Sequence, residues 1–168
     1  MAPEYYDRLP EVRAASPVPI AVGELVSSVP EAVRLVTGHG ADLLRLHLSA
    51  IGGLTPGRKL ADLCELVGVQ TAWHAPADVS PVGFAANLAL DLASPAFGVQ
   101  EGHVYPERVH EVFPGTPVVA AGYATPSNEP GWGVALDERL AARYPPVFGG
   151  HEEWALRVRR PDGAIEAP

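Results

Sequence analysis

Residues 43–73 read LLRLHLSAIGGLTPGRKLADLCELVGVQTAW, and this stretch predicts a strand, a helix and a second strand in succession. The apolar run 43–48 is typical of a strand buried on both faces, and Val69 begins another strand. The residues between them carry an apolar stripe at helical spacing, formed by Leu60, Leu63, Cys64 and Val67. A strand, a helix and a strand of these lengths make one unit of an α/β fold.

Residues with known positional preferences mark the ends of this helix. Thr55 predicts the N-cap and Pro56 the first helical residue, because the amide hydrogen that proline lacks has no partner there. Gly68 stands where a left-handed residue commonly ends a helix. Cys64 lies on the apolar stripe, so we expect a small buried hydrophobic side chain there and not a nucleophile.

The alternation of strand and helix continues on both sides of this unit. Residues 19–22 and residues 97–100 are the other predicted strands. A capping box at Ser28 predicts one further helix, and Ser80, followed by proline, predicts another that ends near Leu92. Strands that alternate with helices in this way form a parallel sheet with right-handed crossovers.

The domain organisation follows from where this pattern ends. Beyond residue 101, prolines and glycines punctuate the chain, and residues 137–143 form one short helical stretch. The end of the chain is polar. We expect residues 1–146 to form one domain and residues 147–168 a C-terminal tail.

Composition and charge exclude several classes of function. A hydrophobic content of 47% supports one sizeable core, and a formal net charge of −8 repels nucleic acid and anionic membrane surfaces. The single cysteine rules out an internal disulfide framework. The N-terminus has no signal-peptide pattern, and no apolar run approaches the ~20 residues of a membrane span. These features predict a soluble, cytoplasmic protein.

Polar side chains recur at the ends of the predicted strands. They are Glu24, Arg45, His47, His74, Asp78 and Glu101. A single glutamate after a strand is most often a solvated loop residue, and a single histidine is as often a structural donor as a functional group. Because the carboxyl ends of parallel strands meet at one edge, where β/α barrels build their active sites, the recurrence favours a functional site. His47 is expected to be a residue of the solvated or structural kind, without a functional role.

Other sites lack support in the sequence. There is no phosphate-binding loop, and the glycine pair at residues 52–53 does not have the spacing of a dinucleotide fingerprint. The histidines at positions 39, 103, 110 and 151 have no zinc-ligand spacing. We expect these histidines to lie on the surface.

Several ordered motifs resemble one family. They are IAVGE at residues 20–24, RLHLSAIGGLT at 45–55, WHAPADVSPVG at 73–83 and FGVQE at 97–101, followed by PGWGV at 130–134, DERLAARYP at 137–145 and RPDG at 160–163. The sequence resembles the mannonate dehydratase family, whose members include bifunctional altronate/mannonate dehydratases and starvation-sensing proteins. This family belongs to the mandelate racemase-like group of the enolase superfamily.

The resemblance implies a fold and an activity. Members resembling this chain have an N-terminal capping domain followed by a (β/α)7β TIM-type barrel, and the motifs here match the C-terminal half of that barrel. Since a complete barrel takes about 250 residues, we expect a partial barrel without the capping domain. The implied activity is the Mg2+-dependent dehydration of an acid sugar such as mannonate or altronate to a 2-keto-3-deoxy acid.

The resemblance also implies roles for individual residues. Glu24 matches a carboxylate ligand of the Mg2+ ion, and Arg45 matches a residue that contacts the substrate. His74 and Asp78 match positions that line the sugar-acid pocket, where they are candidates for catalysis and substrate binding. Glu101 matches the acidic residue that ends the last strand and also contacts substrate. The metal suits the chemistry, because proton removal next to a carboxylate creates negative charge that a divalent cation stabilises.

Departures from the family pattern limit what the chain is expected to do alone. The sequence has no match for the other two Mg2+ carboxylates, for the tyrosine and arginine of the general base, or for the acid histidine. Tyr5 and Tyr6 precede the first matched strand and do not replace that base. Ala75 and Ala77 stand where glycines are usual, and Phe84 where histidine is common, which bears on substrate preference more than on fold. Glu24 alone is expected to bind Mg2+ negligibly.

Three hypotheses follow for the 168-residue chain. In the first, it is part of a split dehydratase, and a partner polypeptide supplies the missing half-barrel to its unpaired sheet edges. In the second, it is a non-catalytic remnant or an interaction module that forms homo-oligomers. In the third, it is a piece of a longer gene. The expected partners are an acid-sugar substrate and a second polypeptide or copy, without nucleic acid or membrane.

Overall fold

The computed structural model describes residues 3–145 of the chain. Contacts group Met1–Leu136 into one compact unit and Asp137–Pro168 into another, of which the structure describes residues 137–145. The expected tail, residues 147–168, lies outside the described residues. The candidate site lies in the first unit.

A parallel sheet forms the centre of the first unit. Its strands stand in the order β1 (Ala21–Val22), β2 (Leu43–Leu44) and β3 (Gln70–Thr71), with Leu44 paired to both Val22 and Thr71. Phe97 adds a parallel bridge to Thr71 at the far edge. The α/β class with parallel strands is therefore confirmed.

The regular strands are shorter than the sequence predicts. The predicted strands span four to six residues, whereas each strand of the sheet has two residues and the fourth is only a bridge. Backbone hydrogen bonds nevertheless continue beyond them, from Ala72 N to Leu44 O at 2.9 Å and from His74 N to Leu46 O at 2.8 Å. The extended segments thus run together to the end that carries the polar residues.

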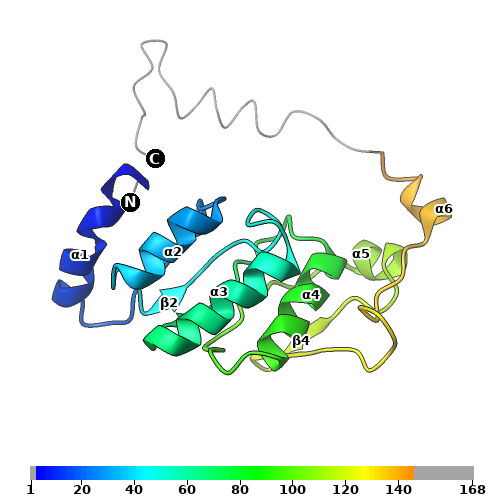
Figure 1. Ribbon diagram of the computed structural model, residues 1–168. Helices are drawn as coiled ribbons and strands as arrows, with labels where there is room; N and C mark the ends of the chain where they lie inside the picture. Colours follow the sequence, from blue (N-terminus) through cyan, green and yellow to red (C-terminus); the bar gives the residue numbers. More distant parts are fainter. Residues whose placement is uncertain (1–2, 146–168) are drawn as a thin grey trace, which may run out of the picture. The chain divides into compact units, whose positions relative to one another are not determined.

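Three helices connect the strands, as the sequence predicts. They are α2 (Val29–Thr37), α3 (Leu54–Val67) and α4 (Pro81–Leu92), and they follow one another along the sheet (Figure 1). Gly68 ends α3 with a left-handed φ of 72°, as predicted. The N-terminus of α3 was mispredicted: Gly53 precedes the helix with φ 92°, so Thr55 lies inside the first turn. Glycine at residue 53 adopts that backbone conformation without a steric penalty.

Serine caps begin the other two helices. Ser28 Oγ accepts a hydrogen bond from Glu31 N at 3.4 Å, and Ser80 Oγ accepts one from Gly83 N at 3.1 Å. Each hydroxyl satisfies an amide that has no partner within its helix. Both predicted caps are confirmed.

Ser80→Ala is expected to destabilise the chain by about 1 kcal/mol, because it removes the cap of α4. Urea unfolding of the purified chain measures this loss. Ser27→Ala is the matched control, since Ser27 is exposed and makes no hydrogen bond among the described residues. Equal stability of the two variants would show that the cap does not stabilise the fold.

The core lies between the sheet and its helices. The largest side chains without exposure include Trp73, Phe84, Leu44, Leu46 and Leu60. Cys64 is also fully buried, and burial raises the pKa of its thiol to about 12. The expectation of a buried, unreactive cysteine is confirmed.

Further elements lie outside the predicted pattern. They are the 3-10 helix Pro3–Arg8, α1 (Leu9–Ala15), α5 (Glu107–Val112) and the antiparallel hairpin of β4 (Val118–Ala120) and β5 (Tyr123–Thr125). These segments are short, and prolines and glycines lie close to them in the sequence. A helical or strand periodicity of apolar residues therefore does not predict them. In the second unit, α6 (Glu138–Ala141) begins after Asp137, whose carboxylate accepts a hydrogen bond from Leu140 N at 2.9 Å. This helix falls within the predicted stretch 137–143.

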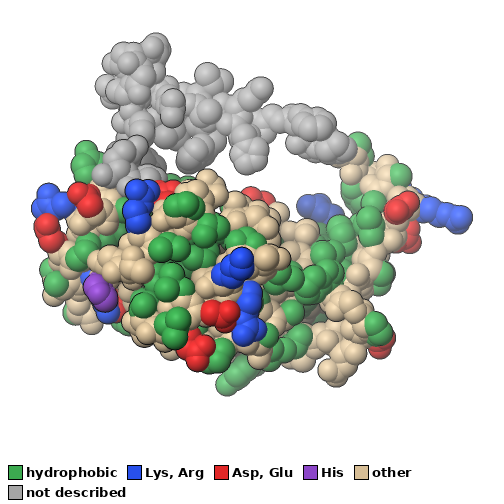
Figure 2. Space-filling view, viewed as in Figure 1, with side chains coloured by type: hydrophobic (Ala, Val, Ile, Leu, Met, Phe, Trp, Pro, Cys, Tyr) green, Lys and Arg blue, Asp and Glu red, His purple; other side chains and the backbone are tan. Residues whose placement is uncertain are grey.

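On the face that Figure 2 shows, basic and acidic side chains do not form separate patches. Basic, acidic and hydrophobic side chains are interspersed there (Figure 2). None of the helices in the described part of the chain is long and apolar enough to cross a bilayer.

Candidate active site

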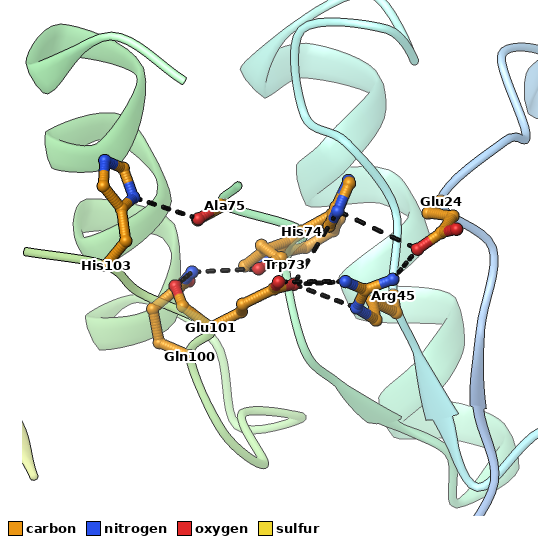
Figure 3. Close-up of polar contacts among 8 residues, drawn as sticks. All are labelled: Glu24, Arg45, Trp73, His74, Ala75, Gln100, Glu101 and His103. Atoms are coloured by element: carbon orange, nitrogen blue, oxygen red, sulfur yellow. Dashed lines mark hydrogen bonds and ion pairs between the residues drawn. The ribbon is translucent and has the colours of Figure 1, made fainter. Parts of the chain in front are cut away.

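The carboxyl end of the sheet brings together residues from four segments. Glu24 follows β1, Arg45 follows β2, His74 comes three residues after β3, and Glu101 ends the segment that starts at the Phe97 bridge. Figure 3 shows these four side chains converging. We call them the carboxylate–arginine cluster.

Arg45 is the centre of this cluster. Its Nε donates to Glu101 Oε2 and its Nη2 to Glu101 Oε1, both at 2.9 Å. Its Nη1 donates to Glu24 Oε2 on the other side. The guanidinium therefore bridges two carboxylates that the sequence places far apart, and its fork binds one of them in the bidentate geometry that suits carboxylates.

His74 faces both carboxylates. Its Nε2 lies 3.8 Å from Glu24 Oε2 and 4.0 Å from Glu101 Oε2. Burial lowers the pKa of His74, and the positive charge of Arg45 lowers it further, against the opposing effect of Glu101. The imidazole is consequently neutral at neutral pH, a form that both donates and accepts a hydrogen bond.

Glu101 is held in its charged form. Burial by itself raises the pKa of this carboxyl, but the hydrogen bonds and charge of Arg45 outweigh it, and the net pKa is lowered. The side chain of Glu101 is one-third exposed. The cluster therefore presents one cation and two carboxylates beside a neutral histidine.

Asp78 and His47 lie near the cluster without joining it. Asp78 is exposed in the loop after His74 and makes no hydrogen bond among the described residues, but its charge raises the pKa of His74. His47 lies edge-on to His74, with ring centroids 5.7 Å apart, and hydrogen-bonds with Ser49 Oγ at 2.8 Å. A hollow of about 210 Å³ opens beside His47 and His74, with Trp132 in its wall.

Two supporting residues were missed from the sequence. Gln100 Nε2 donates to Trp73 O at 2.9 Å and so ties the segment before Glu101 to the segment before His74. His103 Nδ1 donates to Ala75 O at 3.3 Å (Figure 3). The centroid of the His103 ring lies 4.1 Å from that of Tyr105. His103 was expected on the surface and is only partly exposed, because the loop after Glu101 folds back onto the loop after His74. Its position two residues after Glu101 is the only signal in the sequence.

The described residues do not form a complete Mg2+ site. Within residues 3–145, no three side chains of histidine, cysteine, aspartate or glutamate stand close enough to share a metal ion. Glu24 is available as one ligand, but it is paired with Arg45. Mg2+ requires near-octahedral oxygen ligation, so further ligands have to come from elsewhere.

Comparison with known proteins places this arrangement in a family. Residues 1–140 match the family model described as "Enolase C-terminal domain-like". The chain belongs to the enolase C-terminal domain-like family. Polar residues at the carboxyl ends of parallel strands are where barrel enzymes of this kind carry their sites.

Relatives of this enolase-family chain are similar along all or most of its length. A protein from Catenulispora acidiphila named "D-galactonate dehydratase family member" is 67% identical over 168 residues, which are all of this chain and 39% of that protein. The crystal structure of an enolase from Pantoea ananatis, with bound D-gluconate and Mg, is 45% identical with a TM-score of 0.89, over all of this chain and 40% of that one. A mandelate racemase/muconate lactonizing enzyme from Jannaschia sp. CCS1 is 30% identical with a TM-score of 0.80, over 89% of this chain and 38% of that one.

These comparisons test the expected family. The enolase superfamily and the mandelate racemase-like resemblance are confirmed, and so is the association of Mg2+ with the family, since the Pantoea ananatis protein binds it. This enolase-family chain spans about 40% of the length of the relatives it matches. The narrower assignment to mannonate dehydratases stays a prediction, because the similar curated proteins are named for D-galactonate dehydratase.

Proposed function

We propose that this chain contributes the carboxylate–arginine cluster to the active site of an acid-sugar dehydratase. The proposal rests on the position of Arg45. Its guanidinium lies between Glu24 and Glu101 at the carboxyl end of the sheet, and His74 lies beside these carboxylates. An acid sugar presents a carboxylate and a row of hydroxyl groups. A guanidinium, a neutral imidazole and ionised carboxylates together provide donors and acceptors for both kinds of group.

Each residue has a proposed role in binding or proton transfer. Arg45 and Glu101 bind the substrate, Arg45 through charge and Glu101 by accepting hydroxyl hydrogens. His74 and Asp78 bind substrate hydroxyl groups and are the candidates for moving a proton to or from them. The neutral state of His74 suits this, because an imidazole that is not already protonated takes a proton at neutral pH.

Glu24 is the proposed metal ligand of the chain. A bound Mg2+ ion would supply stabilisation of the negative charge that develops on the substrate carboxylate. Glu24 offers one carboxylate for such an ion, and residues outside this chain would supply the others. We therefore expect dehydration only in a complete protein or complex.

Mannonate and altronate are the proposed substrates, with gluconate as an alternative suggested by the ligand of the Pantoea ananatis relative. Loss of the hydrogen on C2 and the hydroxyl on C3 releases one water molecule. The resulting enol becomes a 2-keto-3-deoxy acid. No oxidant or reductant is needed for this reaction.

A chimera tests the proposal. In this chimera, the 168 residues of this chain replace the matching segment of the Pantoea ananatis relative. The relative supplies the rest of the protein. We expect the chimera to dehydrate at least one acid from a panel of mannonate, altronate, gluconate and galactonate, with the 2-keto product measured chemically. Chelation of the metal should abolish the activity and added Mg2+ should restore it.

The unmodified relative and a melting curve of the chimera are the controls. A folded chimera that binds Mg2+ and D-gluconate as the relative does, but converts none of the acids, would contradict the proposed dehydratase function. Activity that survives removal of the metal would contradict the role of Glu24.

A further inference from the structure

His47 lies on the same side of its segment as Arg45. The leucines at positions 44, 46 and 48 alternate with these two residues and are buried in the core, whereas both polar residues are only partly buried. Successive side chains of an extended chain point to opposite faces, so this alternation places His47 on the face that carries the carboxylate–arginine cluster. The imidazole therefore lies next to the candidate active site, although the sequence predicts no functional role for it.

Ser49 restrains the ring of His47. Its Oγ lies 2.8 Å from His47 Nδ1, which is a hydrogen-bond distance. Depending on the tautomer of the imidazole, the hydroxyl donates to Nδ1 or accepts from it, and either bond opposes rotation of the ring. A turn holds the two residues in place, since Ile51 N donates to His47 O at 3.1 Å and Gly52 N donates to Ser49 O at 3.2 Å.

His74 has no hydrogen bond of its own that fixes the plane of its ring. Its Nε2 lies 3.8 and 4.0 Å from the carboxylates of Glu24 and Glu101, which is longer than a hydrogen bond, and its Nδ1 is buried without a partner among the described residues (Figure 3). The ring of His47 meets this ring edge-on, with an angle of 77° between the planes. Such a T-shaped contact is favourable between aromatic rings.

We propose that His47, restrained by Ser49, is a positioning residue that keeps the His74 imidazole turned toward Glu24 and Glu101. The catalytic consequence rests on the proposed function, in which His74 moves a proton at a substrate hydroxyl. An imidazole that rotates freely spends less time in the productive geometry, so turnover falls, whereas Arg45 still binds the substrate carboxylate. The effect on the ring of His74 does not depend on the dehydratase function.

Kinetics of the chimera test the catalytic consequence. His47→Leu should lower kcat by about 30-fold and Ser49→Ala by about fivefold, with KM for the acid sugar within about twofold of the parent value. Ser49→Ala should have no further effect in the presence of His47→Leu, because Ser49 acts only through His47. Ser49→Thr keeps the hydroxyl and should rescue the loss. Ser27→Ala is the matched control, since Ser27 is also exposed and makes no hydrogen bond among the described residues.

Two kinetic outcomes would overturn the proposal. A raised KM at unchanged kcat would mean that His47 binds the substrate directly. Losses that add up in the double variant would mean that Ser49 does not act through His47.

NMR of the 168-residue chain tests the restraint without any turnover. With labelled histidine, a nuclear Overhauser effect between the rings of His47 and His74 is expected in the parent and in Ser27→Ala, and it should be lost in Ser49→Ala. Unchanged backbone amide spectra separate this loss from unfolding. An effect that persists in Ser49→Ala, or that is absent from the parent, refutes the proposal. A chimera that converts no acid sugar contradicts the proposed function instead, and the NMR result then decides this inference.

Discussion

Replacing Glu24 by Gln in the chimera is expected to reduce dehydration by at least about 100-fold, the scale of loss when a group that stabilises transition-state charge is removed. The amide keeps the shape of the side chain but removes its negative charge. It therefore weakens the proposed coordination of Mg2+ and the pairing with Arg45 at the same time. Titration of Mg2+ by calorimetry, with and without the acid sugar, separates loss of the metal from loss of the arginine contact.

Glu65→Gln is the matched control for this prediction. Glu65 is exposed on α3 and makes no hydrogen bond or ion pair among the described residues, so its replacement should leave activity and metal affinity unchanged. If Glu24→Gln retains both Mg2+ affinity and turnover, Glu24 does not bind the metal. If it loses turnover but keeps the metal, Glu24 acts through Arg45 and the substrate.

Asp91→Asn is expected to stabilise the 168-residue chain at about pH 8, by up to ~4 kcal/mol, since each tenfold change in a protonation equilibrium corresponds to about 1.4 kcal/mol. Burial raises the pKa of Asp91 from 3.8 to about 7. Between pH 3.8 and about pH 7, the folded state therefore keeps a proton that the unfolded state has released. Stability consequently falls as the pH rises through this window, and the full penalty is present above it.

Urea unfolding across pH measures this effect. Asp91→Asn should differ little from the parent below about pH 3, where the carboxyl is protonated in both states, and should gain stability relative to the parent as the pH rises. Asp7→Asn is the control, because Asp7 is exposed and its replacement should not alter the pH dependence. A parent chain whose stability does not fall between these pH values would show that Asp91 has a partner in solution.

Local structure was the part of the fold that could be predicted best. Ser28, Ser80 and Gly68 mark helix ends because their effects operate within one turn of the backbone. Thr55 failed as an N-cap because the neighbouring Gly53 already ends the preceding turn. Two adjacent signals for the same boundary cannot be ranked from sequence alone.

The elements beyond Glu101 could not be predicted in the same way. The β4–β5 hairpin pairs only three residues on each strand, with Val119 opposite Ala124, which is too short for an alternating pattern. Its stability comes from packing, since Val119 and Ala124 contact the cluster of buried side chains around Phe84. Likewise, His103 is partly buried only because distant loops meet above it.

The alternation of strands and helices could be predicted from the amino-acid sequence, and so could the kinds of residue at the strand ends. Those features depend on side-chain periodicity and on near neighbours in the chain. The folded chain was needed to show that one guanidinium, that of Arg45, reaches both Glu101, 56 residues away, and Glu24, 21 residues away. The physical reason is that such contacts depend on strand order and register, which set the distance between side chains that the sequence keeps apart.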